Sequence, residues 1–152
     1  MAESGWFPRT PAWAICVGLV LDFDVADGFN PRSTLIPVTR VEGITRALVW
    51  PSASSSIIAG QGIAVHLGVG PERARILLDP AGMLVVLGER GAALAGGARG
   101  ASMLLLREAL QDARDYAANR AAFDRNERRD YALSRLDLEA LVPVVEGRLP
   151  LV

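Results

Sequence analysis

The stretch SRLDLEALVPVVEGRLPLV, residues 134–152, joins an amphipathic helix to the start of a buried strand. We expect the helix around Leu136–Glu146, because its apolar residues recur every three to four positions, and Gly147 then ends it. The apolar run Leu149–Val152 is typical of the first residues of a strand. Because α/β enzymes place their chemistry at the C-terminal tips of such strands, we expect the chain to stop within a structural repeat.

Two local signals define the ends of this helix. Ser134 and Asp137 have the spacing of a capping box, although aspartate is not the preferred third-position partner, so the helix should open there. Pro143 lacks an amide hydrogen and is expected to bend or shorten the helix.

A longer helix is expected upstream, over about Ala101–Asn126. Its apolar residues fall three and four positions apart and form one stripe, while charged residues such as Asp112 and Arg114 occupy the remaining surface. The stripe consists of Leu106, Leu110, Ala113, Ala117 and Ala121.

Three strands precede these helices in the predicted order. They are Ile44–Trp50, the alternating run from Ile63 to Leu67, which puts His66 on its other face, and Met83–Leu87. Pro71-Glu72-Arg73 suits the start of a helix between the second strand and the third. Strands that alternate with helices predict an α/β protein with a mostly parallel sheet, or part of a (β/α) barrel.

The remaining connections are predicted as loops. A short helix capped by Asn30-Pro31 or Thr34 should end at Gly43. Ser52–Ser56 is a small polar loop, Gly60-Gln61-Gly62 is expected to turn, and Gly88–Gly100 is a glycine-rich connection.

The chain divides into an irregular leader, residues 1–21, and one domain, residues 22–152. The apolar run Ala12–Leu21 is too short to span a bilayer, which requires about 20 apolar residues. It is also a poor signal peptide, because Asp22 and Asp24 follow where small residues should precede cleavage.

The composition limits the possible chemistry and partners. The 152 residues contain one histidine, one cysteine and no lysine, so neither a lysine Schiff base nor a Walker-type phosphate loop can form. A net charge of −1 gives no electrostatic reason to expect nucleic acid or an anionic membrane as a partner. The sequence does not indicate a cellular compartment.

The residues alone identify no catalytic group and no metal ligand set. His66 has no second histidine to join it, so we expect it to be structural. Asp22, Asp24 and Asp27 could hold a magnesium ion, but alternating acids fit a solvated strand equally well. The glycine-rich run has no dinucleotide-binding spacing, and no serine lies in a nucleophile elbow.

From Phe23 onward the sequence resembles the imidazolonepropionase-like branch of the metal-dependent amidohydrolases. The resemblance is carried by FNPRSTLIPVTRVEGITRALVWP (Phe29–Pro51), SIIAGQG (Ser56–Gly62) and the segment Arg107–Leu151. Together these segments lie within a region of roughly 130 residues, in the family's order.

This resemblance implies a distorted (β/α)₈ barrel, of which the chain would supply about three βα units. Family members bind one or two divalent, zinc-like metal ions that activate water to attack an amide or cyclic-amide carbon. Their first ligands, a His-x-His pair, lie upstream of the matched region, and no family ligand maps onto a residue of this chain. Within the resemblance, the loops Ser52–Gly62 and Gly88–Gly100 would line the substrate mouth, with Gln61 and Ser55 as the substrate-loop residues.

The sequence therefore predicts a fragment of an amidohydrolase that is inactive alone and holds no metal or other cofactor itself. Its small amide-type substrate would belong to the full-length enzyme. The alternative is a small α/β assembly or binding module without catalysis. In either case, exposed strand edges could support self-association.

Overall fold

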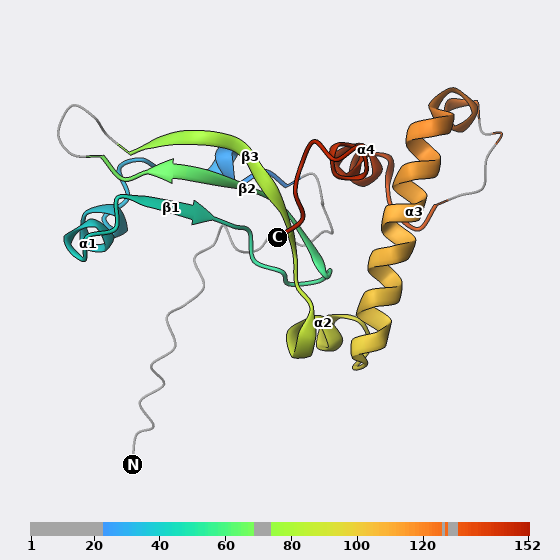
Figure 1. Cartoon of the computed structure of the whole chain (residues 1–152), viewed down its shortest axis with the longest axis horizontal. Coiled ribbons are helices and arrows are strands. Elements are labelled where there is room, and N and C mark those ends of the chain that lie inside the picture. Colours follow the sequence, from blue (N-terminus) through green and yellow to red (C-terminus); the bar gives the residue numbers. More distant parts are fainter. Residues whose placement is uncertain (1–22, 69–73, 126, 128–130) are drawn as a thin grey trace, which may run out of the picture.

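The computed structural model describes residues 23–68, 74–125, 127 and 131–152, and shows a sheet flanked by helices (Figure 1). The expected leader, Asp22 and the expected helix start at 71–73 lie outside the described residues. The sheet has the order β1-β2-β3. Its strands are β1 (Arg46–Val49), β2 (Ile58–His66) and β3 (Arg75–Val85).

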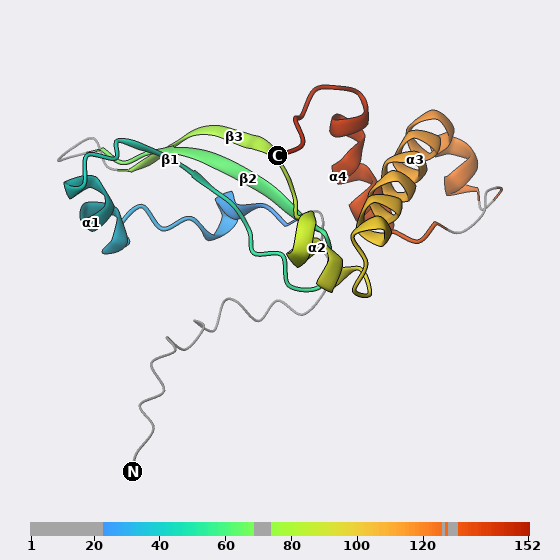
Figure 2. The ribbon, with the colours of Figure 1, turned by 60° about the horizontal axis from the view of Figure 1, so that its bottom comes forward.

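Helices lie at both ends of the sheet. In Figures 1 and 2, α4 lies between the sheet and α3, whereas α1 and α2 lie at opposite ends of the sheet. The helical elements are the 3-10 helix η2 (Val25–Gly28) and the α-helices α1 (Leu35–Val41), α2 (Gly88–Leu94), α3 (Arg99–Asp124) and α4 (Arg135–Val145).

The three-stranded sheet is antiparallel, so the expectation of a mostly parallel sheet was wrong for these strands. The connection from His66 to Arg75 is shorter than the dozen or more residues that a parallel crossover needs. A helix that starts at 71–73 would continue into the residues that follow, which the structure describes. The apolar run Ile76–Leu78, where such a helix would continue, belongs to β3 instead.

A parallel element does form at the C-terminal end of the described chain. Leu151 makes an isolated parallel bridge with Met83 of β3. Met83 N donates to Pro150 O (2.9 Å), Val152 N donates to Met83 O (3.0 Å), and Val85 N donates to Val152 O (2.8 Å). The expected strand at Leu149–Val152 is therefore represented by a single parallel bridge, at Leu151. Between β3 and this bridge the chain forms α2, α3 and α4.

The short-range signals around α4 are confirmed. Ser134 and Asp137 form a reciprocal capping box, in which Asp137 N donates to Ser134 Oγ (3.2 Å) and Ser134 N donates to Asp137 Oδ2 (3.3 Å). Pro143 lies inside the helix, which ends two residues later at Val145. Gly147 then adopts a φ of 74°, a left-handed conformation that favours glycine.

The long helix α3 is confirmed, but its buried stripe is rotated from the one expected. Leu106 and Ala113 are buried as predicted, whereas Ala121 is exposed and Asp112 is buried rather than on the surface. The helix is interrupted at Asn119, whose Nδ2 donates to the carbonyl oxygen of Asp115 (2.9 Å). This interruption changes the direction in which the last residues of the helix face. The buried residues are Ser102, Leu106, Ala109, Asp112, Ala113 and Tyr116.

Two expected loops contain regular structure. Residues 88–94 of the glycine-rich connection form α2, in which Gly91 and Ala92 are buried against the rest of the protein. Gly60-Gln61-Gly62 does not turn, because these residues lie within β2. In both segments tertiary packing overrides the local preference of glycine for turns.

The sheet has one covered face and one open face. Alternation along β2 puts Ile63 and Val65 on the covered face, where Val25 and Phe29 of the η2 region pack against them. On the same face Met83 is fully buried in a second cluster with Leu138, Leu141 and Tyr116 from the helices. The open face carries the cross-strand row Leu48, Ala64 and Leu78, in which the two leucines are 59% and 56% exposed.

On the open face, the Trp50 indole lies against two paired glycines. Gly62 of β2 is the register partner of Gly82 of β3. A Cβ atom added to Gly62 would lie 2.0 Å from Trp50 Cε3, and one added to Gly82 would lie 3.1 Å from Trp50 Cη2 and 3.0 Å from Val152 Cγ2. The absence of side chains at both positions therefore allows Trp50 and the Val152 side chain to lie close to the sheet.

We expect Gly62→Ala to lower the free energy of unfolding by about 1–3 kcal/mol, the usual cost of forcing extra volume into a packed contact. Urea unfolding, with the midpoint and slope compared against the unaltered chain, measures this change. Gly100→Ala in α3 is the matched control, because its added Cβ has no neighbour within 4 Å. Equal unfolding midpoints for the Gly62→Ala variant and the unaltered chain would contradict the packing described for Trp50.

Candidate functional site

The C-terminal ends of the co-directional strands meet at one end of the sheet. β1 and β3 run in the same direction, because both are antiparallel to β2, and residues 150–152 run parallel to β3. The segments that follow β1 and β3 are tied together there. Val86 N donates to Ile57 O (2.7 Å), and Arg90 Nη2 donates to Ala53 O (3.2 Å). In α/β folds this is the end of the sheet at which ligands bind.

A cavity of about 170 Å³ lies between the loop after β1 and α3. Its polar lining is made by Ser55 and Ser56 from the loop and by Glu108 and Asp112 from α3. Leu94, Leu105 and Leu133 contribute to its apolar wall. A mostly apolar hollow with a few convergent polar groups is the usual character of a small-molecule site, and we take this cavity as the candidate site.

The two serines differ in their setting. Ser56 is half-buried and its Oγ accepts a hydrogen bond from Ile58 N (3.2 Å), which fixes the start of β2. Ser55 is exposed at the cavity. The acids are also unlike each other, since Glu108 is exposed whereas Asp112 is 2% exposed. The cavity therefore combines accessible hydroxyl and carboxylate groups with an apolar wall.

The structure separates the two residues that the resemblance assigns to the substrate loops. Ser55 lines the cavity, but Gln61 is not among its lining residues. Gln61 belongs to β2, not to a loop, and its N–H donates to Phe23 O (2.9 Å). Its register partner is Met83, so the Gln61 side chain is on the covered face. Gln61 nevertheless lies near the end of β2 that adjoins the C-terminal ends of β1 and β3.

His66 lies at the other end of β2, away from this site. Its register partners are Arg46 on β1 and Arg75 on β3. Two neighbouring arginines repel a cation, and this setting favours a structural role for His66.

The acidic run considered for magnesium is only partly described. Asp24 accepts a hydrogen bond from Ala26 N (2.8 Å) at the start of η2. Partial desolvation, followed by the nearby charge of Asp24, raises the pKa of the exposed Asp79 on β3 above its usual range. Among the residues that the structure describes, no three histidine, cysteine, aspartate or glutamate side chains gather into a group that could hold a metal ion.

Sequence reasoning missed Glu108 and Asp112 as residues of the site. These two residues lie one turn apart from each other on α3, and their i, i+4 spacing puts them on one side of the helix. That spacing was visible in the sequence, but it does not say whether the side faces solvent or another element. The packing of α3 against the loop of Ser55 determines that this side of the helix faces the cavity.

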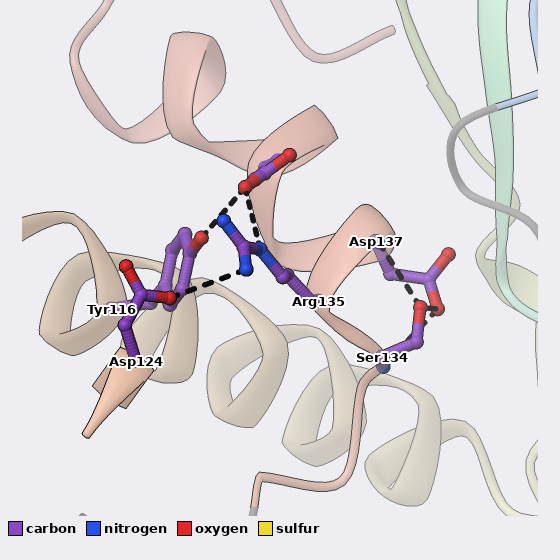
Figure 3. A network of polar contacts seen from close by, with 6 residues as sticks. Tyr116, Asp124, Ser134, Arg135 and Asp137 are labelled. Carbon is purple, nitrogen blue, oxygen red and sulfur yellow. Dashed lines mark hydrogen bonds and ion pairs between the residues drawn. The ribbon is translucent and has the colours of Figure 1, made fainter. Parts of the chain in front are cut away.

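A second polar cluster joins α3 to α4 and is structural in character (Figure 3). Tyr116 Oη donates to Glu139 Oε1 (2.8 Å), and Arg135 Nε donates to the same oxygen (3.1 Å). Arg135 also pairs with Asp124 across the helices at 3.3 Å. Burial, and then the hydrogen bond to Glu139, raise the pKa of Tyr116 above its ordinary value. The cluster therefore ties α4 to α3.

The fold defined by these features is mixed α/β, with an antiparallel three-stranded sheet and one parallel bridge after a helical crossover. A crystal structure of an amidohydrolase from Thermotoga maritima MSB8 is similar to it, with a TM-score of 0.62 and 22% sequence identity. The match covers 82% of this chain and 34% of that one, so the chain spans about a third of its length. At this identity the likeness concerns the fold alone.

No protein-family model matches the chain, and no curated protein matches it in sequence. None of the helices in the described part of the chain is long and apolar enough to cross a membrane.

We expect Tyr116→Phe to raise the pKa of Glu139, because the hydrogen bond from Tyr116 is the main cause that lowers it. A carboxyl group whose pKa is lowered by folding stabilises the fold above its unfolded pKa, here near 4.5, and this stabilisation is lost as the pH falls through the folded pKa. In Tyr116→Phe that acid-dependent loss should be smaller.

An NMR titration of the Glu139 side chain measures the shift directly. Tyr131→Phe is the matched control, because the Tyr131 hydroxyl donates to Asp115 instead (2.5 Å). A Glu139 pKa that stays the same in Tyr116→Phe, or that rises equally in both variants, would contradict the assignment.

Proposed function

We propose that this chain is a section of a metal-dependent amidohydrolase of the imidazolonepropionase-like branch, an enzyme class that hydrolyses amide or cyclic-amide C–N bonds. The chain contributes one βα crossover of the barrel, from β3 through the helices to residues 150–152, and part of the substrate mouth, and it is inactive alone. The observation that carries this proposal is the parallel pairing of residues 150–152 with β3 after the helical crossover. Such a crossover is the repeating unit of a (β/α) barrel.

The direction of the strands and the fold likeness support the proposal. β1, β3 and residues 150–152 end on the same side, next to the cavity lined by Ser55. The η2 region packs against one face of the sheet, and α3 and α4 pack against Met83 at its end, whereas the other face is open, as barrel strands are covered from outside only. The similar Thermotoga protein is described as an amidohydrolase, and the match covers 34% of its chain.

The described residues do not fit the metal that this class would bind. They gather no ligand group, and His66 lies between two arginines. We therefore assign no catalytic step to this chain and expect the ligands on other segments of the longer enzyme.

The contribution of this chain would be to position the substrate. The Gln61 side chain carries both an amide donor and an amide acceptor, which match the two polar groups of a cyclic amide. The Ser55 hydroxyl, at the cavity, can donate or accept. We assign Ser55 to a substrate contact in the complete enzyme. Gln61, whose side chain is on the covered face of β2 near the same end of the sheet, is a second candidate contact, which the Gln61→Ala variant tests.

The open edge of the sheet favours a second candidate function, a non-catalytic assembly module. β1 is an edge strand of the described sheet, and Leu48 on it is 59% exposed. Exposed edges pair with further strands, either from the same chain type or from a complementary one. This module would be a soluble, cooperatively unfolding unit of defined size.

Sequencing the transcript and the surrounding DNA tests the proposed function at the level of the gene. We expect a strand with a His-x-His pair encoded upstream of Phe23 and a histidine-bearing strand encoded after Val152. The longer product should hydrolyse cyclic amides in a metal-dependent manner. Natural start and stop codons that bound the 152 residues, or metal-dependent turnover by the purified 152-residue chain, would contradict the proposal.

In the longer product, we expect Gln61→Ala to raise KM or lower kcat, because a hydrogen bond to the substrate is lost. Steady-state kinetics measures both constants. Gln111→Ala is the matched control, because Gln111 is exposed on α3 and distant from β2 in the sequence. Unchanged kinetic constants for Gln61→Ala would remove this residue from the substrate site.

A further inference from the structure

A larger cleft, of about 390 Å³, is lined in part by the start of α1. Figure 2 shows α1 at the end of the sheet that is opposite to α2. The cleft is formed by the start of α1, by the turn that precedes this helix, and by Gly68 and Ala74 next to the ends of β2 and β3. This cleft is separate from the cavity lined by Ser55, and the proposed hydrolase function makes no use of it.

Among the described residues that line this cleft, the charged groups are both positive. Arg32 and Arg40 are the charged residues among its described lining, and no described carboxylate lines it. Ser33 and Thr34 add hydroxyl groups. In a protein whose net charge is −1, this concentration of positive charge gives the cleft a potential opposite to that of the whole chain.

Arg40 is held in position by the sheet. Its Nη1 donates to Gly68 O (2.8 Å), a contact that joins residues 28 positions apart in the sequence. A guanidinium group has five N–H donors in a rigid plane, so one bond to a carbonyl leaves further donors for a ligand. Arg40 therefore presents a positioned donor set rather than a freely moving charge.

The turn before α1 presents the second arginine. Asn30 Oδ1 accepts a hydrogen bond from Arg32 N (2.9 Å), and Ser33 N donates to Asn30 O (3.1 Å). This side-chain-supported turn fixes the backbone that carries Arg32, whose side chain is exposed at the cleft. Arg46 and Arg75, the two partners of His66, add positive charge at the same end of the sheet.

We propose that this cleft binds a small ligand through an oxyanion group, a phosphate or a carboxylate. Arg40 and Arg32 contact the oxygens, because charge-assisted hydrogen bonds from a guanidinium fork match both groups. The Ser33 and Thr34 hydroxyls supply further donors. Ile36 and Pro37 line the cleft beside the arginines and contact the remainder of the ligand.

Isothermal titration of the whole chain at low ionic strength tests this site, with inorganic phosphate in one arm and succinate in the other. We expect saturable binding in at least one arm, and the arm that saturates identifies the type of oxyanion. Arg32→Ala should weaken this binding by about tenfold or more, as should Arg40→Gln. Raising the salt concentration should weaken it further, because exposed charges are screened.

Arg107→Ala is the matched control, since Arg107 is exposed on α3 and does not line the cleft. Circular dichroism of each variant distinguishes a loss of binding from a loss of folding. Of the two arginines, the exposed Arg32 is the one whose substitution should disturb the fold less, because Arg40 is bonded to Gly68 O. The proposal is overturned if neither ligand saturates, if a folded Arg32→Ala binds as tightly as the unaltered chain, or if Arg107→Ala weakens binding equally.

Discussion

Three backbone hydrogen bonds between β3 and residues 150–152 determine the organisation of this protein. They fix the last segment parallel to β3, and a parallel neighbour can be reached only by a long crossover. That crossover consists of α2, α3 and α4, and the tie between Tyr116 and Glu139 holds the last two helices together. The covered face of the sheet, the cavity at the strand ends and the position of α4 all follow from this pairing.

The same pairing explains why the two faces of the sheet differ. The helices α3 and α4 pack against Met83 and the η2 region packs against Ile63 on one face, whereas Leu48 and Leu78 are exposed on the other. On the open face, Trp50 and Val152 lie close to the sheet because Gly82 has no side chain. A large exposed apolar surface on a water-facing sheet carries a cost, and this surface suits a sheet that is covered by further strands of a barrel. The open face thus agrees with the proposed section of an amidohydrolase.

Features that depend on local chemistry could be predicted from the sequence, whereas those that depend on distant contacts could not. The capping box at Ser134, the end of α4 at Gly147 and the strand at Leu149–Val152 each follow from a few adjacent residues. The Gly60-Gln61-Gly62 run was expected to turn but lies within β2. The close approach of Trp50 that requires Gly62 is a tertiary contact, and adjacent residues do not reveal it. For the site, Ser55 lies at a cavity and its role toward a substrate stays a prediction, whereas its neighbours on α3 depend on how that helix packs.

Hydrogen exchange at β3 tests the parallel pairing most directly. Met83 N and Val85 N donate to residues 150 and 152, whereas Val86 N donates to Ile57 O. We expect slow exchange at all three amides in the whole chain. Deleting residues 150–152 should then speed exchange at Met83 and Val85 and leave Val86 protected. Fast exchange at Met83 and Val85 in the whole chain, or no change on deletion, would show that the pairing does not organise this fold.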